Sequence, residues 1–173
     1  MRVAYQGVAG AFGHEACLAF VPGHEPLPCD TFAAVIETVT SDGAALGMLP
    51  LANNAAGETG ARALIEGAPL RIVAEHDLAV RMHLAALPGV PLERVTAITS
   101  HPVALGQCSR VLEELGLPTR EAANTAIAAA RLSGEDAVLA SEAAAALYGL
   151  TILRRDVQDR ADNLTRFAVV ARA

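Results

Sequence analysis

The chain has 173 residues, of which 53% are hydrophobic and 18% charged, and its formal net charge is −6 at pH 7. A chain of this length and hydrophobicity buries a core, which excludes a disordered protein. All 13 basic residues are arginine; the lack of lysine excludes Schiff-base chemistry and a Walker-type phosphate lysine, and an acidic chain with dispersed arginines argues against a nucleic-acid partner.

No segment predicts membrane insertion or export. Glycine, proline or charge interrupts every apolar stretch well before membrane-spanning length, and the N-terminus opens directly into strand-like residues 2–6. We therefore expect a cytoplasmic protein. The three cysteines, Cys17, Cys29 and Cys108, are odd in number and unevenly spaced, so we expect reduced structural thiols and no metal site.

The chain begins with a predicted strand, a glycine-rich turn and a helix. A short apolar strand over residues 2–6 leads into the loop of residues 7–13, which contains Gly10 and Ala11, and a helix begins near His14. This arrangement favours an anion site, because free backbone N–H groups and the helix dipole point at the ligand. The glycine spacing is not that of a dinucleotide fingerprint. We interpret the loop as the wall of a carboxylate pocket.

A second helix and strand lead to a polar loop. Thr31 is the predicted N-cap of a helix that ends before residue 42, and a strand follows over residues 45–49. Residues 50–59 are mostly small or amide side chains, including Asn53 and Asn54. Their place directly after a strand favours a binding loop, and a plain turn is the alternative.

The middle of the chain predicts a second lobe. A strand over residues 70–74 and a second extended stretch over residues 78–87 indicate a passage between lobes near His76. Further strand–helix units follow, including one helix from His101 to Leu115. The alternation predicts α/β layers with largely parallel strands, whose carboxyl ends gather ligands. The polar residues at such ends are in the loops at 7–13, 52–57, 100–101, 124–125 and 141.

The last strand is preceded by an amide, a hydroxyl and a guanidinium, from Asn163, Thr165 and Arg166. Arg166 is suited to hold a carboxylate with two parallel hydrogen bonds, and the other two side chains to bind a hydroxyl or a carbonyl. The alternative is an ordinary strand whose arginine is a solvated surface charge. For His83 and His101, structural roles are favoured over catalysis.

Motifs along the whole chain resemble the catalytic domain of the prephenate dehydratase family, and the opening motif is similar to that of its arogenate dehydratase relatives. Each motif alone is weak, but their order and spacing are specific. They are Tyr5-Gln6-Gly7, Gly10-Ala11-Phe12, Thr31-Phe32, Pro50-Leu51-Ala52-Asn53, Ser100-His101-Pro102, Ala104-Leu105, Gln107-Cys108, Asn124-Thr125-Ala126, Ala140-Ser141, Tyr148-Gly149-Leu150 and Asn163-Leu164-Thr165-Arg166-Phe167.

The resemblance implies an α/β fold of two subdomains, similar to type II periplasmic binding proteins, with the active site in the cleft between the lobes. The first lobe would comprise residues 1–76 and 154–173, and the second residues 77–153. The resemblance also implies a homodimer or higher homo-oligomer without metal or organic cofactor. The chain stops at Ala173, so we expect no C-terminal ACT regulatory domain; a separate regulatory subunit or a shortened chain would give the same sequence.

The reaction implied by the resemblance converts prephenate to phenylpyruvate, with loss of carbon dioxide and water. Thr165 would assist the leaving hydroxyl, Arg166 would anchor a carboxylate, and Asn53 would bind the substrate from the first lobe. The residues implied to line the substrate are Gly10, Ala11, Asn54, Ser100, Thr125, Ser141, Asn163 and Phe167.

Two departures from the family pattern leave alternatives open. The family usually has Pro-Ile-Glu-Asn-Ser or Pro-Ile-Glu-Asn-Thr, whereas this chain has Ala52 in place of the acid and Asn54 in place of the hydroxyl; its glycine turn has also lost polar groups. Glu58 would replace the missing carboxyl only if the loop folds back. The alternatives are an arogenate dehydratase, a non-aromatising prephenate decarboxylase and a catalytically silent binder of small carboxylates.

Overall fold

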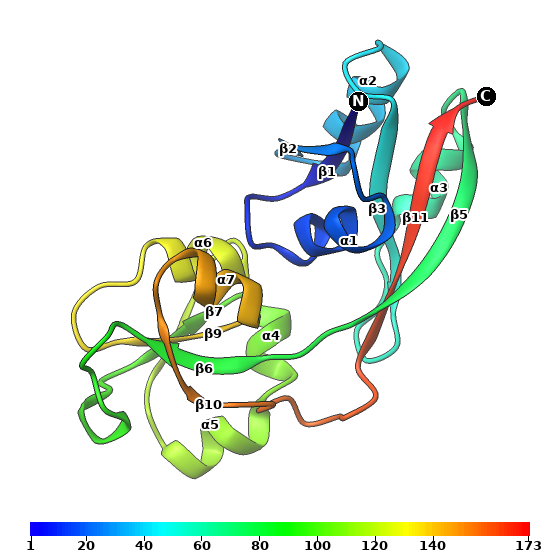
Figure 1. Cartoon of the computed structure of the whole chain (residues 1–173). Coiled ribbons are helices and arrows are strands. Elements are labelled where there is room, and N and C mark those ends of the chain that lie inside the picture. Colours follow the sequence, from blue (N-terminus) through cyan, green and yellow to red (C-terminus); the bar gives the residue numbers. More distant parts are fainter. The chain divides into compact units, whose positions relative to one another are not determined.

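The computed structural model describes residues 1–173 and divides the chain into two compact units. Unit 1 comprises Met1–Ala79 and Leu164–Ala173, and unit 2 comprises Val80–Asn163 (Figure 1). The chain thus crosses between the units after residues 79 and 163, whereas the sequence placed the crossings after residues 76 and 153. The positions differ because residues 75–77 continue a strand of unit 1, and residues 156–163 hydrogen-bond within unit 2.

Unit 1 is built on a mixed sheet in the strand order β2-β1-β3-β11-β5, with β4 paired to β3 outside this path. β1 is parallel to β2 and β3, but β11 is antiparallel to β3 and β5. The expectation of largely parallel strands was therefore wrong here. β11 begins beside the carboxyl ends of β3 and β5 and runs between them in the opposite direction. The strands are β1 (Arg2–Gln6), β2 (Glu25–Cys29), β3 (Leu46–Asn53), β4 (Gly57–Glu58), β5 (Leu70–Ala79) and β11 (Leu164–Arg172), and the helices are α1 (Phe12–Phe20), α2 (Phe32–Thr40) and α3 (Ala61–Glu66).

Alternation along the central strands gives this sheet two apolar faces. On one face α1 packs against the strands, and on the other α2 and α3 do so. β11 lies between β3 and β5 and is buried from Phe167 to Val170, which confirms the predicted buried terminal strand. The strand residues on the α1 face are Val3, Tyr5, Met48, Phe167 and Val169, and those on the opposite face are Ala4, Leu49, Leu51, Ala168 and Val170.

Prolines affect two strands of unit 1 in different ways. The sequence did not predict β2, because Pro26 and Pro28 both lack the N–H group that a strand interior needs. β2 lies at the edge of the sheet, where two prolines are tolerated and discourage pairing with another chain. In β3, Pro50 pairs with Phe167 next to a register shift, so the strand continues to Asn53 instead of ending at residue 49.

Unit 2 contains a five-stranded sheet in the order β10-β6-β9-β7-β8. β7 is parallel to β8 and β9, whereas β6 is antiparallel to β9 and β10. Alanine-rich α6 and α7 pack on one face of the sheet. None of the helices in the chain combines the length and apolar character that crossing a membrane requires. The elements are β6 (His83–Ala86), the 3₁₀ turn Leu92–Arg94, β7 (Ile98–Ser100), α4 (Pro102–Gly106), α5 (Ser109–Leu115), β8 (Thr119–Glu121), α6 (Thr125–Ala130), β9 (Ala137–Ala140), α7 (Glu142–Leu147) and β10 (Thr151–Arg154).

The single helix predicted from His101 to Leu115 is interrupted at Gln107 and Cys108, so that expectation was wrong. The Cys108 side chain does not cap α5. Instead the carboxylate of Asp159 accepts hydrogen bonds from the backbone N–H groups of Ser109 at 2.9 Å and Arg110 at 3.1 Å, and from the Ser109 hydroxyl at 2.7 Å. A distant carboxylate thus supplies the cap that periodicity along the helix cannot predict.

We expect Asp159→Ala to lower the free energy of unfolding by about 1–2 kcal/mol at neutral pH, as for the loss of a helix cap. Burial raises the pKa of Asp159, but the hydrogen bonds from Ser109 and Arg110 outweigh it and hold the pKa below its ordinary value. A lowered pKa in the folded state means that this stabilisation is present above the unfolded-state pKa, about 3.9, and is lost as the pH falls through the folded-state value.

Denaturant titrations at pH 7 and at about pH 3 measure this effect on wild type and variant. The difference in the free energy of unfolding between wild type and variant should be smaller at about pH 3 than at pH 7. A difference that stays the same at both pH values would contradict the assignment of Asp159 as an ionised cap.

Candidate active site

The centre of the candidate site is a cross-strand pair, Asn53 of β3 and Thr165 of β11. The two residues lie directly opposite each other in the antiparallel register, so their side chains share one face of the sheet. The Asn53 Nδ2 group donates to Thr165 Oγ1 at 2.9 Å and to the Leu164 carbonyl at 3.1 Å. The structure thus brings together the amide and the hydroxyl that the sequence singled out 112 positions apart.

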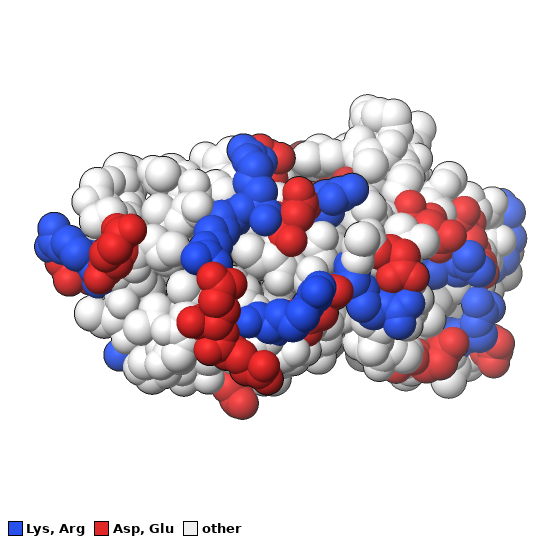
Figure 2. Space-filling view, turned by 90° about the horizontal axis from the view of Figure 1, so that it is seen from below, with Lys and Arg blue, Asp and Glu red and all other residues white.

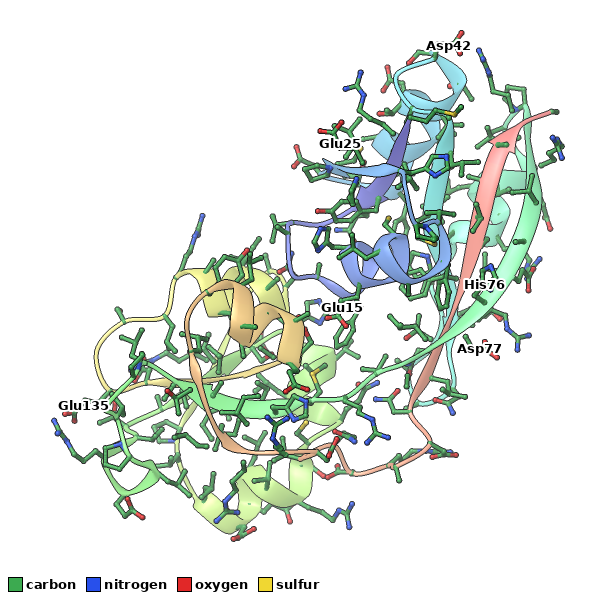
Figure 3. The ribbon with its side chains drawn as sticks, in the orientation of Figure 1. Glu15, Glu25, Asp42, His76, Asp77 and Glu135 are labelled. Atoms are coloured by element: carbon green, nitrogen blue, oxygen red, sulfur yellow. The ribbon has the colours of Figure 1, made fainter.

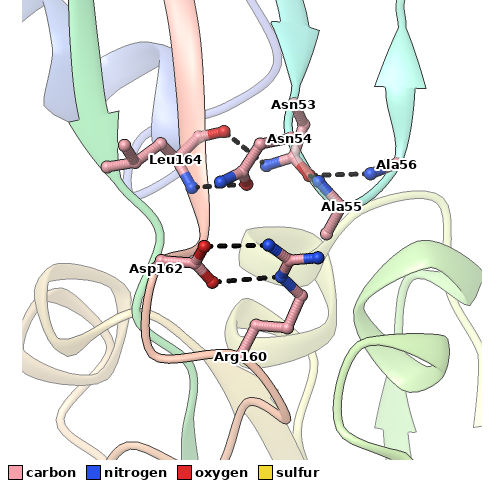
Figure 4. Close-up of polar contacts among 7 residues, drawn as sticks. All are labelled: Asn53, Asn54, Ala55, Ala56, Arg160, Asp162 and Leu164. Carbon is pink, nitrogen blue, oxygen red and sulfur yellow. Dashed lines mark hydrogen bonds and ion pairs between the residues drawn. The ribbon is translucent and has the colours of Figure 1, made fainter.

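Backbone groups determine which end of the Asn53 amide faces Thr165. The N–H groups of Ala55 and Ala56 both donate to Asn53 Oδ1 at 2.9 Å (Figure 4). The oxygen must point toward these two donors, so Nδ2 must point toward Thr165. Thr165 Oγ1 accepts this bond, and its own hydroxyl hydrogen remains available for a ligand.

Asn54 joins the turn after β3 to the first residue of β11. Its Oδ1 accepts from the Leu164 N–H at 2.9 Å, and its own N–H donates to the Leu164 carbonyl at 3.0 Å (Figure 4). The amide that replaces the family hydroxyl therefore holds the turn against β11 beside Thr165. Its predicted contact with substrate stays a prediction.

The register places position 52, where the acid is missing, on the face of the sheet away from Thr165. Ala52 pairs with Arg166 on one side and with Glu58 of β4 on the other. Neighbours along a strand point to opposite faces. The side chains of Ala52, Arg166 and Glu58 therefore lie on the face opposite to Asn53 and Thr165. The loop does fold back and bring Glu58 beside Ala52, but on the face away from the Thr165 hydroxyl.

Arg166 pairs with Asp77, its cross-strand partner on β5. Its Nε and Nη2 atoms donate to the two carboxylate oxygens at 2.9 and 3.0 Å; Figure 3 labels Asp77 on β5. The bonds from Arg166 hold the pKa of Asp77 below its ordinary value, and those same bonds raise the pKa of Arg166. The bidentate geometry predicted for a substrate carboxylate is thus made with a carboxylate of the protein, and the anchoring role of Arg166 stays a prediction.

Two substitutions separate the roles of Arg166. If the pair only joins β5 to β11, Arg166→Gln and Asp77→Asn should each change the free energy of unfolding very little, since both side chains are half exposed. Both should then leave KM for the substrate nearly unchanged, which is the result we expect from the geometry. A KM that rises in Arg166→Gln and does not rise in Asp77→Asn would instead show that Arg166 holds the substrate.

The glycine loop follows the carboxyl end of β1, and Asn53 lies at the carboxyl end of β3. Because β1 and β3 are parallel, the two lie at the same end of the sheet. Gly7 and Gly10 have φ angles of 116° and 84°, which side chains with a Cβ rarely adopt. The Ala11 N–H donates to the Val8 carbonyl at 3.0 Å, and α1 begins directly after Ala11. Gly10 and Ala11 thus sit at a helix N-terminus, as predicted. Phe167 is 2% exposed and packs in the core under this edge.

In unit 2, two of the three predicted hydroxyls form hydrogen bonds within the fold. The Ser100 hydroxyl is buried and donates to the Leu139 carbonyl at 2.8 Å, while Ser141 Oγ accepts from the Ala144 N–H and caps α7. Thr125 is the first residue of α6, which Asn124 caps. Three helices begin at this carboxyl edge and present backbone N–H groups there. Contacts of Ser100, Thr125 and Ser141 with substrate stay predictions.

Asn163 belongs to unit 2 and is separated by the crossing from the Thr165 that it precedes by two residues. Its buried side chain donates from Nδ2 to Gln107 Oε1 at 3.0 Å, at the interruption between α4 and α5. Gln107 lies in one of the motifs that resemble the family and had no predicted role. Asp77 and His14 likewise had no predicted role. The partner of Asp77 is Arg166 on β11, and the partner of His14 is Gly10 in the glycine loop.

Most arginines are neutralised by carboxylates. Ten of the 13 form ion pairs within the chain, and the Arg160–Asp162 pair is drawn in Figure 4. On the face shown in Figure 2, arginine and acidic side chains lie interspersed. The arginines therefore form no continuous basic patch on this face.

Comparisons with known proteins identify the family of the chain. The prephenate dehydratase family matches residues 3–173. "Arogenate dehydratase/prephenate dehydratase 2, chloroplastic" of Arabidopsis thaliana is 40% identical over 99% of this chain and 46% of its own length. A "bifunctional N-acyl-homoserine lactone acylase/prephenate dehydratase" of Komagataeibacter europaeus is 41% identical over 98% of this chain and 62% of its own length. The chain spans about half the length of the plant relative.

Solved structures support the fold assignment. The structure of prephenate dehydratase with L-Phe from Arthrobacter aurescens has a TM-score of 0.90 at 28% identity, covering 100% of this chain and 61% of that one. A periplasmic substrate-binding protein of an ABC transporter from Coxiella burnetii has a TM-score of 0.53 at 13% identity over 99% of this chain and 85% of its own, which shows the predicted α/β fold alone. By its match over nearly every residue, the chain belongs to the prephenate dehydratase family.

Proposed function

We propose that the protein is a prephenate dehydratase that converts prephenate to phenylpyruvate. The observation that supports this most directly is the hydrogen bond from Asn53 Nδ2 to Thr165 Oγ1, with the amide orientation set by Ala55 and Ala56. It leaves the hydroxyl hydrogen of Thr165 to be donated to a ligand. Arogenate dehydratase is the alternative substrate assignment, supported by the name of the Arabidopsis relative.

The proposed reaction breaks two bonds of the substrate ring. The bond to the ring carboxylate breaks and releases carbon dioxide, its electron pair completes the aromatic ring, and the ring hydroxyl departs with the electrons of the C–O bond. The departing hydroxide takes a proton from solvent and becomes water. No electrons pass to an outside acceptor, so the proposal includes no redox cofactor.

The role proposed for Thr165 is to donate a hydrogen bond to the departing hydroxyl. A threonine hydroxyl is too weak an acid to protonate it outright, so its contribution is a positioned donor where negative charge develops. Asn53 supports that role by occupying an acceptor site on Oγ1. A decarboxylase that leaves the ring non-aromatic keeps its hydroxyl, and the retention of Thr165 disfavours that reading.

For the carboxylates of the substrate, the proposed donors in unit 1 are backbone N–H groups of the glycine loop, at the same sheet edge as Asn53. The homo-oligomeric assembly and the cytoplasmic location stay predictions.

The test is to incubate purified protein separately with prephenate and arogenate and to follow phenylpyruvate, phenylalanine and carbon dioxide. Phenylpyruvate from prephenate, well above the slow acid-catalysed background, would support the proposal, whereas phenylalanine from arogenate alone would select the alternative. Carbon dioxide with a dihydro product would indicate the non-aromatising reaction. Calorimetric binding of prephenate without turnover would indicate a silent binder.

A further inference from the structure

We propose that His14 is a positioning residue of this site: it holds the glycine loop in its binding conformation through Gly10, and its protonation releases the loop and weakens the binding of the substrate carboxylate. The inference rests on the proposed function for the identity of the ligand. The contact between His14 and Gly10 stands independently of that function.

The anchor is a hydrogen bond that runs back from α1 to the loop before it. The Gly10 N–H donates to His14 Nδ1 at 3.3 Å. His14 is the third residue of α1, and Ala11 at the N-cap has no side chain able to cap the helix. This resembles a capping box, in which a side chain of the first turn bonds a backbone N–H that precedes the helix. Because Gly10 has a φ of 84°, an anchor here selects one conformation of a flexible residue.

The position of the His14 ring is itself constrained. The ring contacts that of Tyr5, with centroids 5.6 Å apart and planes inclined by 42°, and Tyr5 is 1% exposed. The preceding residue, Gly13, lies so close to β1 that a Cβ there would meet the Gln6 carbonyl and Tyr5 Cδ2, each at 3.2 Å. The first turn of α1 therefore packs directly against β1. This packing fixes the position of the His14 ring relative to the loop.

The bond requires a neutral imidazole. Nδ1 accepts from Gly10, so in the neutral ring the hydrogen is on Nε2. Protonation places a second hydrogen on Nδ1, and two donors then face each other. Burial lowers the pKa of His14 below its ordinary value, so the bond is intact at neutral pH. Since the folded-state pKa is depressed, the stabilisation is present above the unfolded-state value and is lost as the pH falls through the folded one.

The elements packed around His14 carry other titratable groups. β1 presents Tyr5, and α1 presents Glu15 and Cys17. Burial raises the pKa of the Cys17 thiol to about 12, so that group stays uncharged across the acid range. β3 presents the apolar Met48, and β5 presents His76, which stacks on Phe20 at the far end of α1. Figure 3 labels Glu15 and His76.

The first measurement uses NMR to follow the Gly10 amide and the His14 ring through a pH titration, without any substrate. The Gly10 resonance should move with the His14 titration. In His14→Asn, whose Oδ1 offers an acceptor near the position of Nδ1 and does not titrate, that movement should vanish. A Gly10 amide resonance that does not move as His14 titrates would overturn the proposal. This measurement is made on wild type, so it does not depend on whether the variant folds.

The second measurement is the pH profile of KM and kcat for prephenate. In wild type, KM should rise roughly tenfold below the His14 pKa, as for the loss of one hydrogen bond, with kcat nearly constant. His14→Asn should remove this acid limb, and His14→Phe, which keeps the ring against Tyr5 without the acceptor, should raise KM at every pH. His24→Asn, the same change in the loop after α1, is the matched control and should keep the limb.

The outcomes separate the two proposals. An acid limb that persists unchanged in His14→Asn would overturn the role of His14. If the Gly10 amide follows His14 but prephenate shows neither calorimetric binding nor turnover, the anchoring of the loop is supported and the proposed function fails.

Discussion

Thr165→Val is expected to lower kcat for prephenate by about 10²-fold or more, the usual effect of removing one donor to a developing negative charge. Valine keeps the shape and strand propensity of threonine, so the sheet around β11 should be preserved. If the hydroxyl acts only in the transition state, kcat and kcat/KM should fall together, with little change in KM. Steady-state kinetics and a thermal unfolding curve measure both effects.

Thr165→Ser is the matched control for this substitution, because serine retains the hydroxyl that accepts from Asn53. It should keep most of the activity that valine loses. Equal loss in the serine and valine variants would point to the methyl group and to packing. Full activity in Thr165→Val would remove Thr165 from the chemistry.

Asn53→Asp is expected to lower kcat by a similar or larger factor, with almost no change in side-chain shape. The carboxylate still accepts from Ala55 and Ala56, but the donor toward Thr165 is gone. The Thr165 hydroxyl would then donate to the carboxylate, and its lone pairs would face the departing group. The substitution also places a negative charge near the Leu164 carbonyl, which Asn53 Nδ2 now contacts at 3.1 Å.

A double-mutant cycle tests whether Asn53 acts through Thr165. Once valine has removed the hydroxyl, Asn53→Asp should add much less than its effect in wild type, because residues that act as a unit are strongly non-additive. Free energies of unfolding for all four proteins control for looser packing of the turn. Additive losses in kcat would show that Asn53 contacts the substrate independently.

The local sequence was sufficient for many elements. The glycine-rich turn before α1, the Thr31 cap of α2, the proline at the start of α4 and the apolar run of β11 are each recognised within a few neighbouring residues. Such signals are local because caps, turns and period-two burial depend on the nearest positions along the chain. They identified Asn53, Thr165 and the glycine loop as candidates.

Other elements depended on contacts that no local window contains. β2 exists despite two prolines because it lies at a sheet edge. The expected long helix of unit 2 is interrupted where Asp159, 50 residues beyond Ser109, caps α5. β3 runs past Pro50 because the register shift against β11 accommodates a residue without an N–H group.

By itself, the sequence determined which side chains are available: a hydroxyl, an amide and a guanidinium at the end of buried strands, and glycines where the backbone must turn. Only the tertiary structure decided their partners. Pairing in register places Thr165 opposite Asn53. Because side chains alternate along β11, Arg166 points to the other face, where it pairs with Asp77. The reason is physical: which face a side chain occupies depends on the strand register, and the antiparallel register here relates residues 112 and 89 positions apart.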